Sequence, residues 1–169
     1  MTKVIIGAAG TYYPGWISTN MGELNLLRAD DWLKYAPVEC ALAEHVWEHL
    51  TPEQGIIAAR NVALYVPRLR VATPDGYYPD EAYVKRAVLG ECPGDHNNLF
   101  TIIYLTDLFH DAGYSVTPLE WWSPDGVYHH RPFTDEYGYI QRSLLHDKRN
   151  RAGVLGYTSI IIDCVKGQQ

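Results

Sequence analysis

Two glutamates and two histidines stand close together in the run Glu44-His45-Val46-Trp47-Glu48-His49. The small apolar residues 40–43 just before them predict a buried strand. Ligands of open α/β sheets bind beyond the carboxyl ends of the strands, so Glu44 and His45 are expected at a ligand-binding edge. The pKa of a histidine lies near neutrality, which makes His45, with Glu44 beside it, a candidate to accept a proton from a hydroxyl or an amine.

The second half of this run has two other interpretations. Glu48 and His49 could begin the following helix and hydrogen-bond its first turn, which would make their role structural. His45 and His49 also have the i, i+4 spacing of a metal-binding pair on a helix. Thr51-Pro52 starts the helix only after them, which disfavours that pair. We therefore expect His45 to be catalytic, His49 to be mainly structural, and no metal to be bound.

Three further polar groups fall in predicted turns and loops. Asp75 follows a predicted strand and has Tyr77 close by, although an Asp-Gly turn would explain Asp75 equally well. His96 lies in a polar cluster before a predicted helix, which one of the two asparagines after it would cap. His129 could help to bind an anionic or sugar-like group, or lie in a solvated loop. We take Asp75 as a candidate catalytic residue, and Tyr77, His96 and His129 as candidate substrate-binding residues.

Length and composition limit the class of protein. The 169 residues carry a formal net charge of −6, and 47% of them are hydrophobic, which predicts one globular domain over residues 1–169 with a long irregular insertion at about 123–157. The acidic balance disfavours a nucleic-acid partner. No apolar run is long enough to span a membrane. We expect a cytoplasmic protein that acts on a small molecule, with a homodimer as one option for its assembly.

The order of elements predicts an α/β sheet with helices on both faces. A first strand at Val4-Ile5-Ile6 leads into a tight turn, Gly7-Ala8-Ala9-Gly10, and a capping box at Thr51-Pro52-Glu53-Gln54 starts a helix. Further strands are expected at 16–19, 40–43, 69–73, 114–119 and 158–165, and helices at about 52–64, 79–88 and 101–112. Only residues 8–15 separate the first two strands, and a parallel crossover normally needs about a dozen residues or more. The first crossover helix is therefore truncated or missing, or residues 16–19 do not form a strand beside the first one.

In this order, the sequence resembles the class I S-adenosylmethionine-dependent methyltransferases, and most closely the short predicted bacterial ones. The resemblance rests on the first strand with its glycine turn and on residues 43–53, 69–76, 108–116 and 157–166. It implies a Rossmann-like sheet that is mostly parallel, with an antiparallel last strand. It also implies S-adenosylmethionine as the cofactor and methyl transfer to a small-molecule or sugar-like acceptor.

The resemblance also implies which residues bind the cofactor. They are Gly7, Ala8, Ala9 and Gly10 in the turn, together with Asn20, Asp30 and Glu44. A branched side chain at Gly7 is expected to obstruct the ligand. Two features depart from the family, because Ala9 and Thr11 replace later glycines and Asn20 replaces an acidic residue. These departures favour an alternative, in which a methyltransferase-like fold binds a ligand or partner, or catalyses another reaction, having lost methyl transfer.

Overall fold

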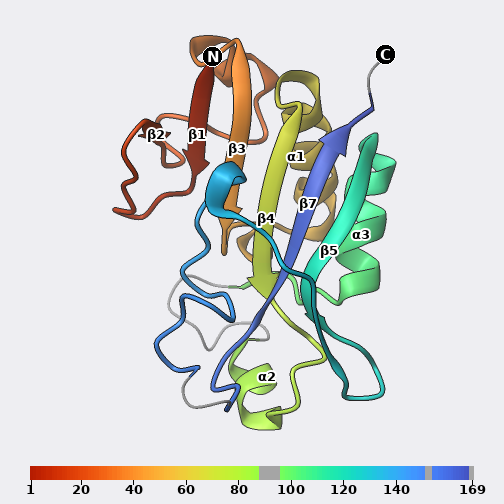
Figure 1. Cartoon of the computed structure of the whole chain (residues 1–169). Helices are drawn as coiled ribbons and strands as arrows, with labels where there is room; N and C mark the ends of the chain where they lie inside the picture. The colour runs from red at the N-terminus through yellow and green to blue at the C-terminus, as the bar shows by residue number, and fades with distance from the viewer. Residues whose placement is uncertain (88–95, 151–153, 168–169) are drawn as a thin grey trace.

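The computed structural model describes residues 1–87, 96–150 and 154–167. Within these ranges, one sheet has seven strands in the order β2-β1-β3-β4-β7-β5-β6 (Figure 1). Their bounds are β1 Thr2–Ile6, β2 Trp16–Ser18, β3 Val38–Glu44, β4 Arg68–Pro74, β5 Tyr114–Trp122, β6 Tyr128–His130 and β7 Ser159–Lys166. The four strands β2, β1, β3 and β4 pair in parallel, whereas β7 is antiparallel to both β4 and β5. The predicted Rossmann-like sheet with an antiparallel last strand is confirmed.

The structure also decides between the two expectations for the second strand. β2 lies beside β1 and pairs in parallel with it, with Lys3 opposite Trp16 and Ile5 opposite Ser18. Residues 7–15 make this connection without a helix. The first crossover is therefore reduced to a loop, and the turn after β1 lies directly between the two strands.

The helices are α1 Pro52–Tyr65, α2 Glu81–Ala87 and α3 Ile102–Asp111, with short 3-10 helices η1 Ala29–Lys34, η2 Trp47–His49 and η3 Asp135–Tyr137. The capping box of α1 is present, because Gln54 N donates to Thr51 Oγ1 while Thr51 N donates to Gln54 Oε1. Thr101 caps α3 by accepting a hydrogen bond from Tyr104 N. The expectation that an asparagine caps this helix is therefore wrong.

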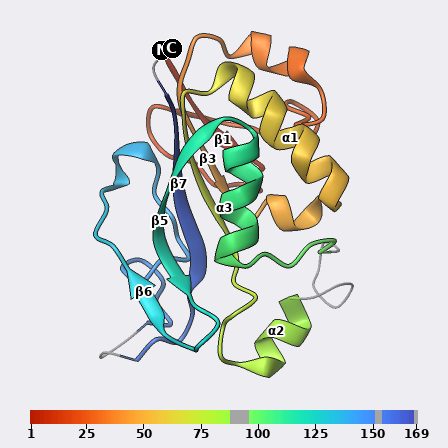
Figure 2. The ribbon, with the colours of Figure 1, turned by 90° about the vertical axis from the view of Figure 1, so that its right-hand side faces the viewer.

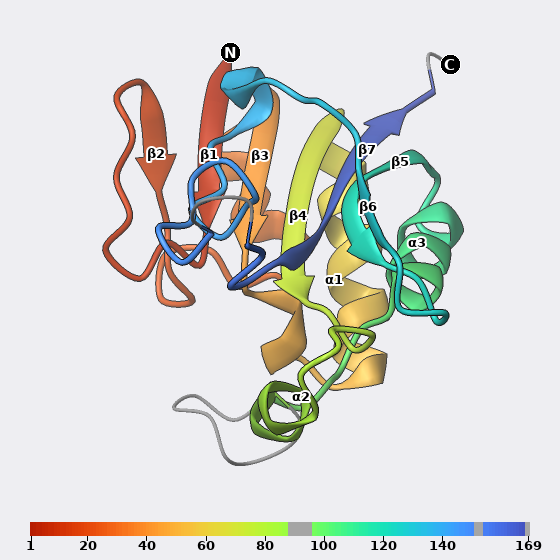
Figure 3. The ribbon, with the colours of Figure 1, turned by 60° about the horizontal axis from the view of Figure 1, so that its bottom comes forward.

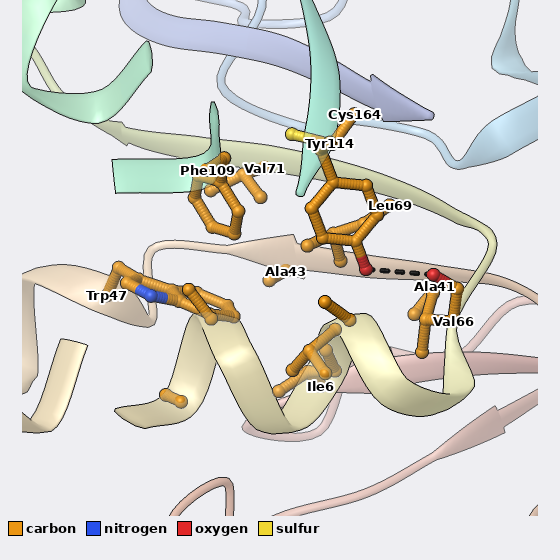
Figure 4. Packing of buried hydrophobic residues seen from close by; sticks show 14 of the residues in the cluster. Ile6, Ala41, Ala43, Trp47, Val66, Leu69, Val71, Phe109, Tyr114 and Cys164 are labelled. Atoms are coloured by element: carbon orange, nitrogen blue, oxygen red, sulfur yellow. Dashed lines mark hydrogen bonds between the residues drawn. The ribbon is translucent and has the colours of Figure 1, made fainter. Parts of the chain in front are cut away.

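The main core lies between the sheet and the two longer helices, which both cover one face (Figure 2). Ala59 and Val62 of α1 and Phe109 of α3 are fully buried there. Figure 4 shows Trp47 and Phe109 facing each other, with ring centroids 5.2 Å apart. In the same view, the Tyr114 hydroxyl donates to the Val66 carbonyl oxygen at 2.8 Å.

The expectation of helices on both faces is wrong. On the opposite face, the described residues form no α-helix, and the segment after β6 covers the sheet instead (Figure 2). Ile140 and Phe133 of this segment pack against Leu42, Ala72 and Ile161. A short crossover after β1 leaves this face without a helix, and an irregular chain buries the apolar side chains of the strands.

Buried polar contacts fix this covering segment to the sheet. Arg70 on β4 is 1% exposed; it pairs with Asp163 on β7 and donates from Nη1 to the carbonyl oxygens of Thr134 and Gly138, both at 2.7 Å. Glu120 on β5 accepts a hydrogen bond from Leu144 N at 2.9 Å. The long insertion therefore has a defined course wherever the structure describes it.

Two of the three cysteines can be placed. Cys40 and Cys164 are buried, free thiols, and Cys92 lies outside the described residues. Among the described residues, no helix combines the length and the apolar character needed to cross a membrane.

Candidate functional site

A cavity of about 690 Å³ opens at the carboxyl ends of β1, β3 and β4. This volume falls within the roughly 300–1,000 Å³ usual for small-molecule and cofactor sites. Figure 3 shows α2 and the chain that leads into β7 around this edge of the sheet. The lining residues are Ile5, Ile6, Gly7, Ala8, Ala9, Thr11, Leu42, Glu44, His45, Glu48, His49, Pro74, Tyr83, Ala87, His96, Gln141, Arg142, Arg149 and Tyr157.

The predicted glycine turn forms one wall of the cavity. Gly7, Ala8 and Ala9 line it, whereas Gly10 is exposed and does not. Gly7 has φ +59°, and a Cβ built there would lie 2.8 Å from Val46 Cγ2. A side chain at Gly7 would therefore collide first with Val46, which corrects the expectation that it would obstruct the ligand directly.

Asn20 and Asp30 do not line the cavity. Both are exposed. Asn20 Oδ1 accepts a hydrogen bond from Ala9 N at 2.9 Å, so its side chain supports the turn after β1. Asp30 lies in the short 3-10 helix η1.

His45 lines the cavity just beyond the end of β3. Its backbone has φ +56°, which is uncommon for a residue other than glycine, and its N–H donates to the Ala72 carbonyl oxygen at 2.8 Å. The imidazole spans two neighbours, because Nδ1 lies 3.0 Å from Glu48 Oε1 and Nε2 lies 3.0 Å from Ser159 Oγ. The Tyr157 hydroxyl is 3.4 Å from the same Nε2. His45 is thus held in a defined orientation at the cavity wall.

Glu44 also lines the cavity, but its carboxylate fixes the insertion. Oε1 accepts a hydrogen bond from Arg142 N at 2.8 Å and Oε2 accepts one from Gln141 N at 3.1 Å. The Arg142 guanidinium lies 3.6 Å from Oε1. Glu44 therefore joins the end of β3 to the chain that closes the cavity.

Asp75 does not reach the cavity. It is fully buried and accepts hydrogen bonds from Tyr77 N at 2.9 Å and Trp122 N at 2.7 Å. Burial raises the pKa of Asp75 to about 6, although the two backbone N–H groups act in the opposite direction. These contacts agree with the turn interpretation of this residue.

Two of the three predicted substrate-binding residues also lie outside the cavity lining. Tyr77 is in the turn after β4, and His129 is on β6, where it stacks on Trp121 at 4.8 Å between ring centroids. His96 does line the cavity, and the structure brings it beside Glu48 and His49. The ring centroids of His49 and His96 are 4.9 Å apart.

An aromatic and basic wall, which the sequence did not predict in full, completes the cavity. The Tyr83 hydroxyl on α2 donates to the Tyr157 hydroxyl at 2.8 Å, and the Arg149 guanidinium lies 3.9 Å from the centroid of the Tyr157 ring. Burial raises the pKa of Tyr157, so this hydroxyl stays protonated at neutral pH. Tyr83 and Tyr157 are far apart in the sequence and show no local spacing that would have marked them.

Comparisons with known proteins identify the fold. No family model and no curated protein matches the sequence. Among solved structures, the small RNA methyltransferase HEN1 is similar over 99% of this chain and 23% of its own, with a TM-score of 0.59 and 13% identity. A methyltransferase from Thermotoga maritima, described as a possible histamine N-methyltransferase, is similar over 98% of this chain and 82% of its own, with a TM-score of 0.54 and 14% identity.

A third similar structure carries a ligand. Magnesium protoporphyrin IX methyltransferase from Synechocystis, with bound S-adenosylhomocysteine, matches 98% of this chain and 74% of its own, with a TM-score of 0.52 and 11% identity. The chain spans less than a quarter of HEN1 and about three quarters or more of the other two. It therefore has the fold of the class I S-adenosylmethionine-dependent methyltransferases.

Proposed function

We propose that this chain is an S-adenosylmethionine-dependent methyltransferase, that its cofactor binds in the cavity beyond β1, β3 and β4, and that its acceptor is a small-molecule or sugar-like compound. One observation carries the proposal: the cavity lies at the carboxyl ends of parallel strands and borders the turn after β1, in a fold shared with a methyltransferase that binds S-adenosylhomocysteine. Ligands of open α/β sheets bind at this edge.

The first wall of the cavity is suited to a cofactor. Gly7 and Ala8 bring the backbone to the cavity surface without a large side chain, so a ligand can approach the turn closely. S-adenosylmethionine supplies an electrophilic methyl group, and the protein has to align a nucleophile with it. In this proposal the turn binds the cofactor, and the wall of Tyr83, Tyr157 and Arg149 positions the acceptor.

His45 is placed to take the proton that the acceptor loses. A neutral imidazole donates from one nitrogen and accepts at the other. Nδ1 lies at ion-pair distance from the carboxylate of Glu48, 3.0 Å, which favours a proton on Nδ1. Nε2 is then the nitrogen that can accept a proton, and it faces the hydroxyls of Ser159 and Tyr157. Replacing His45 by alanine should lower turnover about 100-fold to 10,000-fold and change cofactor affinity little.

A second candidate function rests on a specific observation. Asn20 Oδ1 accepts a hydrogen bond from Ala9 N and Asn20 does not line the cavity, so its side chain supports the turn and does not stand on the surface where a cofactor ribose would bind. This favours a ligand-binding or partner-binding protein, or an enzyme for another reaction, with the methyltransferase fold. Under this alternative, the cavity would bind a ligand without methyl transfer.

Calorimetric titration with S-adenosylhomocysteine tests the cofactor assignment, with two neighbouring tryptophan variants as the comparison. Thr11 lines the cavity, whereas Tyr12 is 72% exposed and does not. Thr11→Trp should weaken binding at least tenfold by filling part of the cavity, and Tyr12→Trp should leave binding unchanged. Absence of binding to the unaltered chain at millimolar ligand would refute the proposal, and binding without transfer to any of a panel of hydroxyl and amine acceptors would favour the alternative.

A further inference from the structure

Three potential metal-binding side chains stand together in the lining of the cavity. Glu48 and His49 from η2 and His96 from the segment before α3 each bring one potential ligand atom to the same place, and these three atoms lie within 4.8 Å of one another. This set differs from the i, i+4 pair of His45 and His49 that the sequence suggested and disfavoured, because His96 comes from a distant part of the chain.

The buried carboxylate of Glu48 is a second observation that points to a bound cation. Its side chain is 1% exposed, and neither oxygen accepts a hydrogen bond from the described residues. His45 Nδ1 lies at ion-pair distance from Oε1, 3.0 Å, without hydrogen-bond geometry. A buried carboxylate without hydrogen bonds is energetically costly, and a bound cation would remove that cost.

His96 is oriented as a metal-binding histidine usually is. Its Nδ1 lies 2.8 Å from the carbonyl oxygen of Ala87. A carbonyl oxygen only accepts hydrogen bonds, so Nδ1 carries the proton and Nε2 keeps a lone pair for a ligand. A backbone carbonyl that fixes the second ring nitrogen in this way is typical of histidine ligands to metals.

The backbone holds the two parts of this group together. Asn97 N and Asn98 N both donate to the Glu48 carbonyl oxygen, at 2.7 and 3.1 Å. Asn97 Nδ2 donates to the His49 carbonyl oxygen at 2.8 Å. These hydrogen bonds, which all use backbone acceptors, hold Glu48 and His49 beside the segment that carries His96.

We propose that Glu48, His49 and His96 bind a divalent first-row transition metal ion, with the remaining coordination positions open to the cavity. Two imidazole nitrogens and one carboxylate oxygen suit zinc, manganese, iron or cobalt better than the all-oxygen sites of calcium and magnesium. Bonds of about 2.0–2.2 Å place two ligands of one ion at most about 4.4 Å apart. Side-chain shifts of about half an ångström would therefore close the site.

The metal site goes beyond the proposed methyl transfer and does not depend on it. Glu48, His49 and His96 all line the same cavity as the turn after β1. An ion held by three protein ligands can bind an oxygen of a second molecule and lower its pKa. Metal binding can be measured on the chain without any cofactor, so failure of the metal proposal and failure of the cofactor proposal are distinguishable.

The test is a titration of the tag-free chain, freed of metal with a chelator, with Co²⁺ followed by visible absorption and with Zn²⁺ and Mn²⁺ followed by calorimetry. We expect one ion per chain and visible bands typical of cobalt bound by nitrogen and oxygen. Glu48→Gln and His96→Gln should each lower metal affinity at least tenfold. The metal should also raise the unfolding temperature of the unaltered chain, and not that of either variant.

Two matched variants control the experiment. His110→Gln removes a histidine whose Nδ1 also faces a backbone carbonyl oxygen, that of Tyr114 at 3.0 Å, but which lies on α3 outside the cavity. Glu53→Gln removes an acidic residue in the first turn of α1. Both should bind the metal as the unaltered chain does. Absence of a stoichiometric site, or His96→Gln with unchanged affinity and an intact fold by circular dichroism, would overturn the proposal.

Discussion

The two faces of the sheet are covered in different ways. On one face, α1 and α3 bury a continuous apolar core that includes Trp47 and Phe109, both 0% exposed. On the other face, the chain after β6 has one short 3-10 helix in its described residues and a smaller apolar cluster around Ile140. Buried polar groups of the strands, above all Arg70 and Glu120, fix this chain in place.

The two faces therefore contribute differently to stability and to the cavity. The helical face depends on apolar packing, which is insensitive to pH. The opposite face depends on ions and hydrogen bonds, and it supplies Gln141, Arg142 and Arg149 to the cavity wall. Damage to the first face should unfold the whole chain, whereas damage to the second should also open the cavity.

The largest expected effect is on the helical face. Phe109→Ala removes a fully buried ring that packs on Trp47, and we expect the free energy of unfolding to fall by about 3–5 kcal/mol. Ile103→Ala on the same helix is the control, because Ile103 is 57% exposed and should cost no more than about 0.5 kcal/mol. Denaturant titration measures both, and an equal loss in the two variants would contradict the account of this core.

Breaking the polar anchor of the opposite face should have the next largest effect. Arg70→Met leaves Asp163 without its partner and frees the carbonyl oxygens of Thr134 and Gly138, so we expect a loss of about 3 kcal/mol, at the low end for a buried pair because Asp163 is 20% exposed. Replacing Asp163 by leucine in the same chain should restore part of the lost free energy of unfolding. If the double variant loses as much free energy of unfolding as the two single variants together, the pair is not coupled.

The stability of the opposite face should also depend on pH, through Glu120. Burial raises its pKa from 4.5 to about 7 in the folded chain, so the folded state holds this proton more tightly than the unfolded state does. The contribution of Glu120 to stability is therefore full below about pH 4.5 and is lost as the pH rises to about 7. Glu120→Gln, which mimics the protonated form, should gain stability relative to the unaltered chain over this interval. Denaturant titrations at pH 4.5 and 7.5 measure this gain, and a constant difference would contradict it.

The smallest effect compares two threonines at helix starts. Thr51 caps α1 through its side chain, and Thr51→Ala should cost about 1 kcal/mol. Thr134 precedes η3 on the opposite face without a side-chain capping hydrogen bond, so Thr134→Ala should cost less than about 0.5 kcal/mol. Thermal unfolding of the two variants in the same buffer measures the difference. An equal decrease in unfolding temperature would contradict a specific capping contribution of Thr51.

The same difference explains why the sequence predicts the structure of the helical face better than that of the opposite face. The helical face follows rules of spacing and capping, so the starts of α1 and α3 were predicted within a residue or two. The covering chain on the other face has no period, and its contacts join Arg70 to Thr134 and Glu120 to Leu144 across long separations. No local pattern could have indicated that this chain replaces helices.

The candidate site also contains residues that the sequence predicts and residues that only the tertiary fold brings together. Glu44 and His45 were predicted near a ligand because they directly follow a predicted strand, and the family resemblance implied the same for Gly7, Ala8 and Ala9. These five residues do line the cavity. His96, predicted as a substrate-binding residue, also lines the cavity, whereas Tyr83 and Tyr157 were not predicted. All three reach the cavity from loops and a short helix, so their grouping depends on the tertiary fold. Asp75 also follows a strand, but its side chain turns inward to two backbone N–H groups, which the position in the sequence alone does not reveal.

The proposed function places the cofactor in the cavity between the turn after β1 and the covering chain. The most direct test is a crystal structure of the chain grown with S-adenosylhomocysteine. We predict that the ligand lies in this cavity, against Gly7 and Ala8, with its sulfur toward His45 and with Arg149 and Tyr157 on the far side. A ligand bound elsewhere on the molecule, or a sulfur that faces away from His45, would contradict the account.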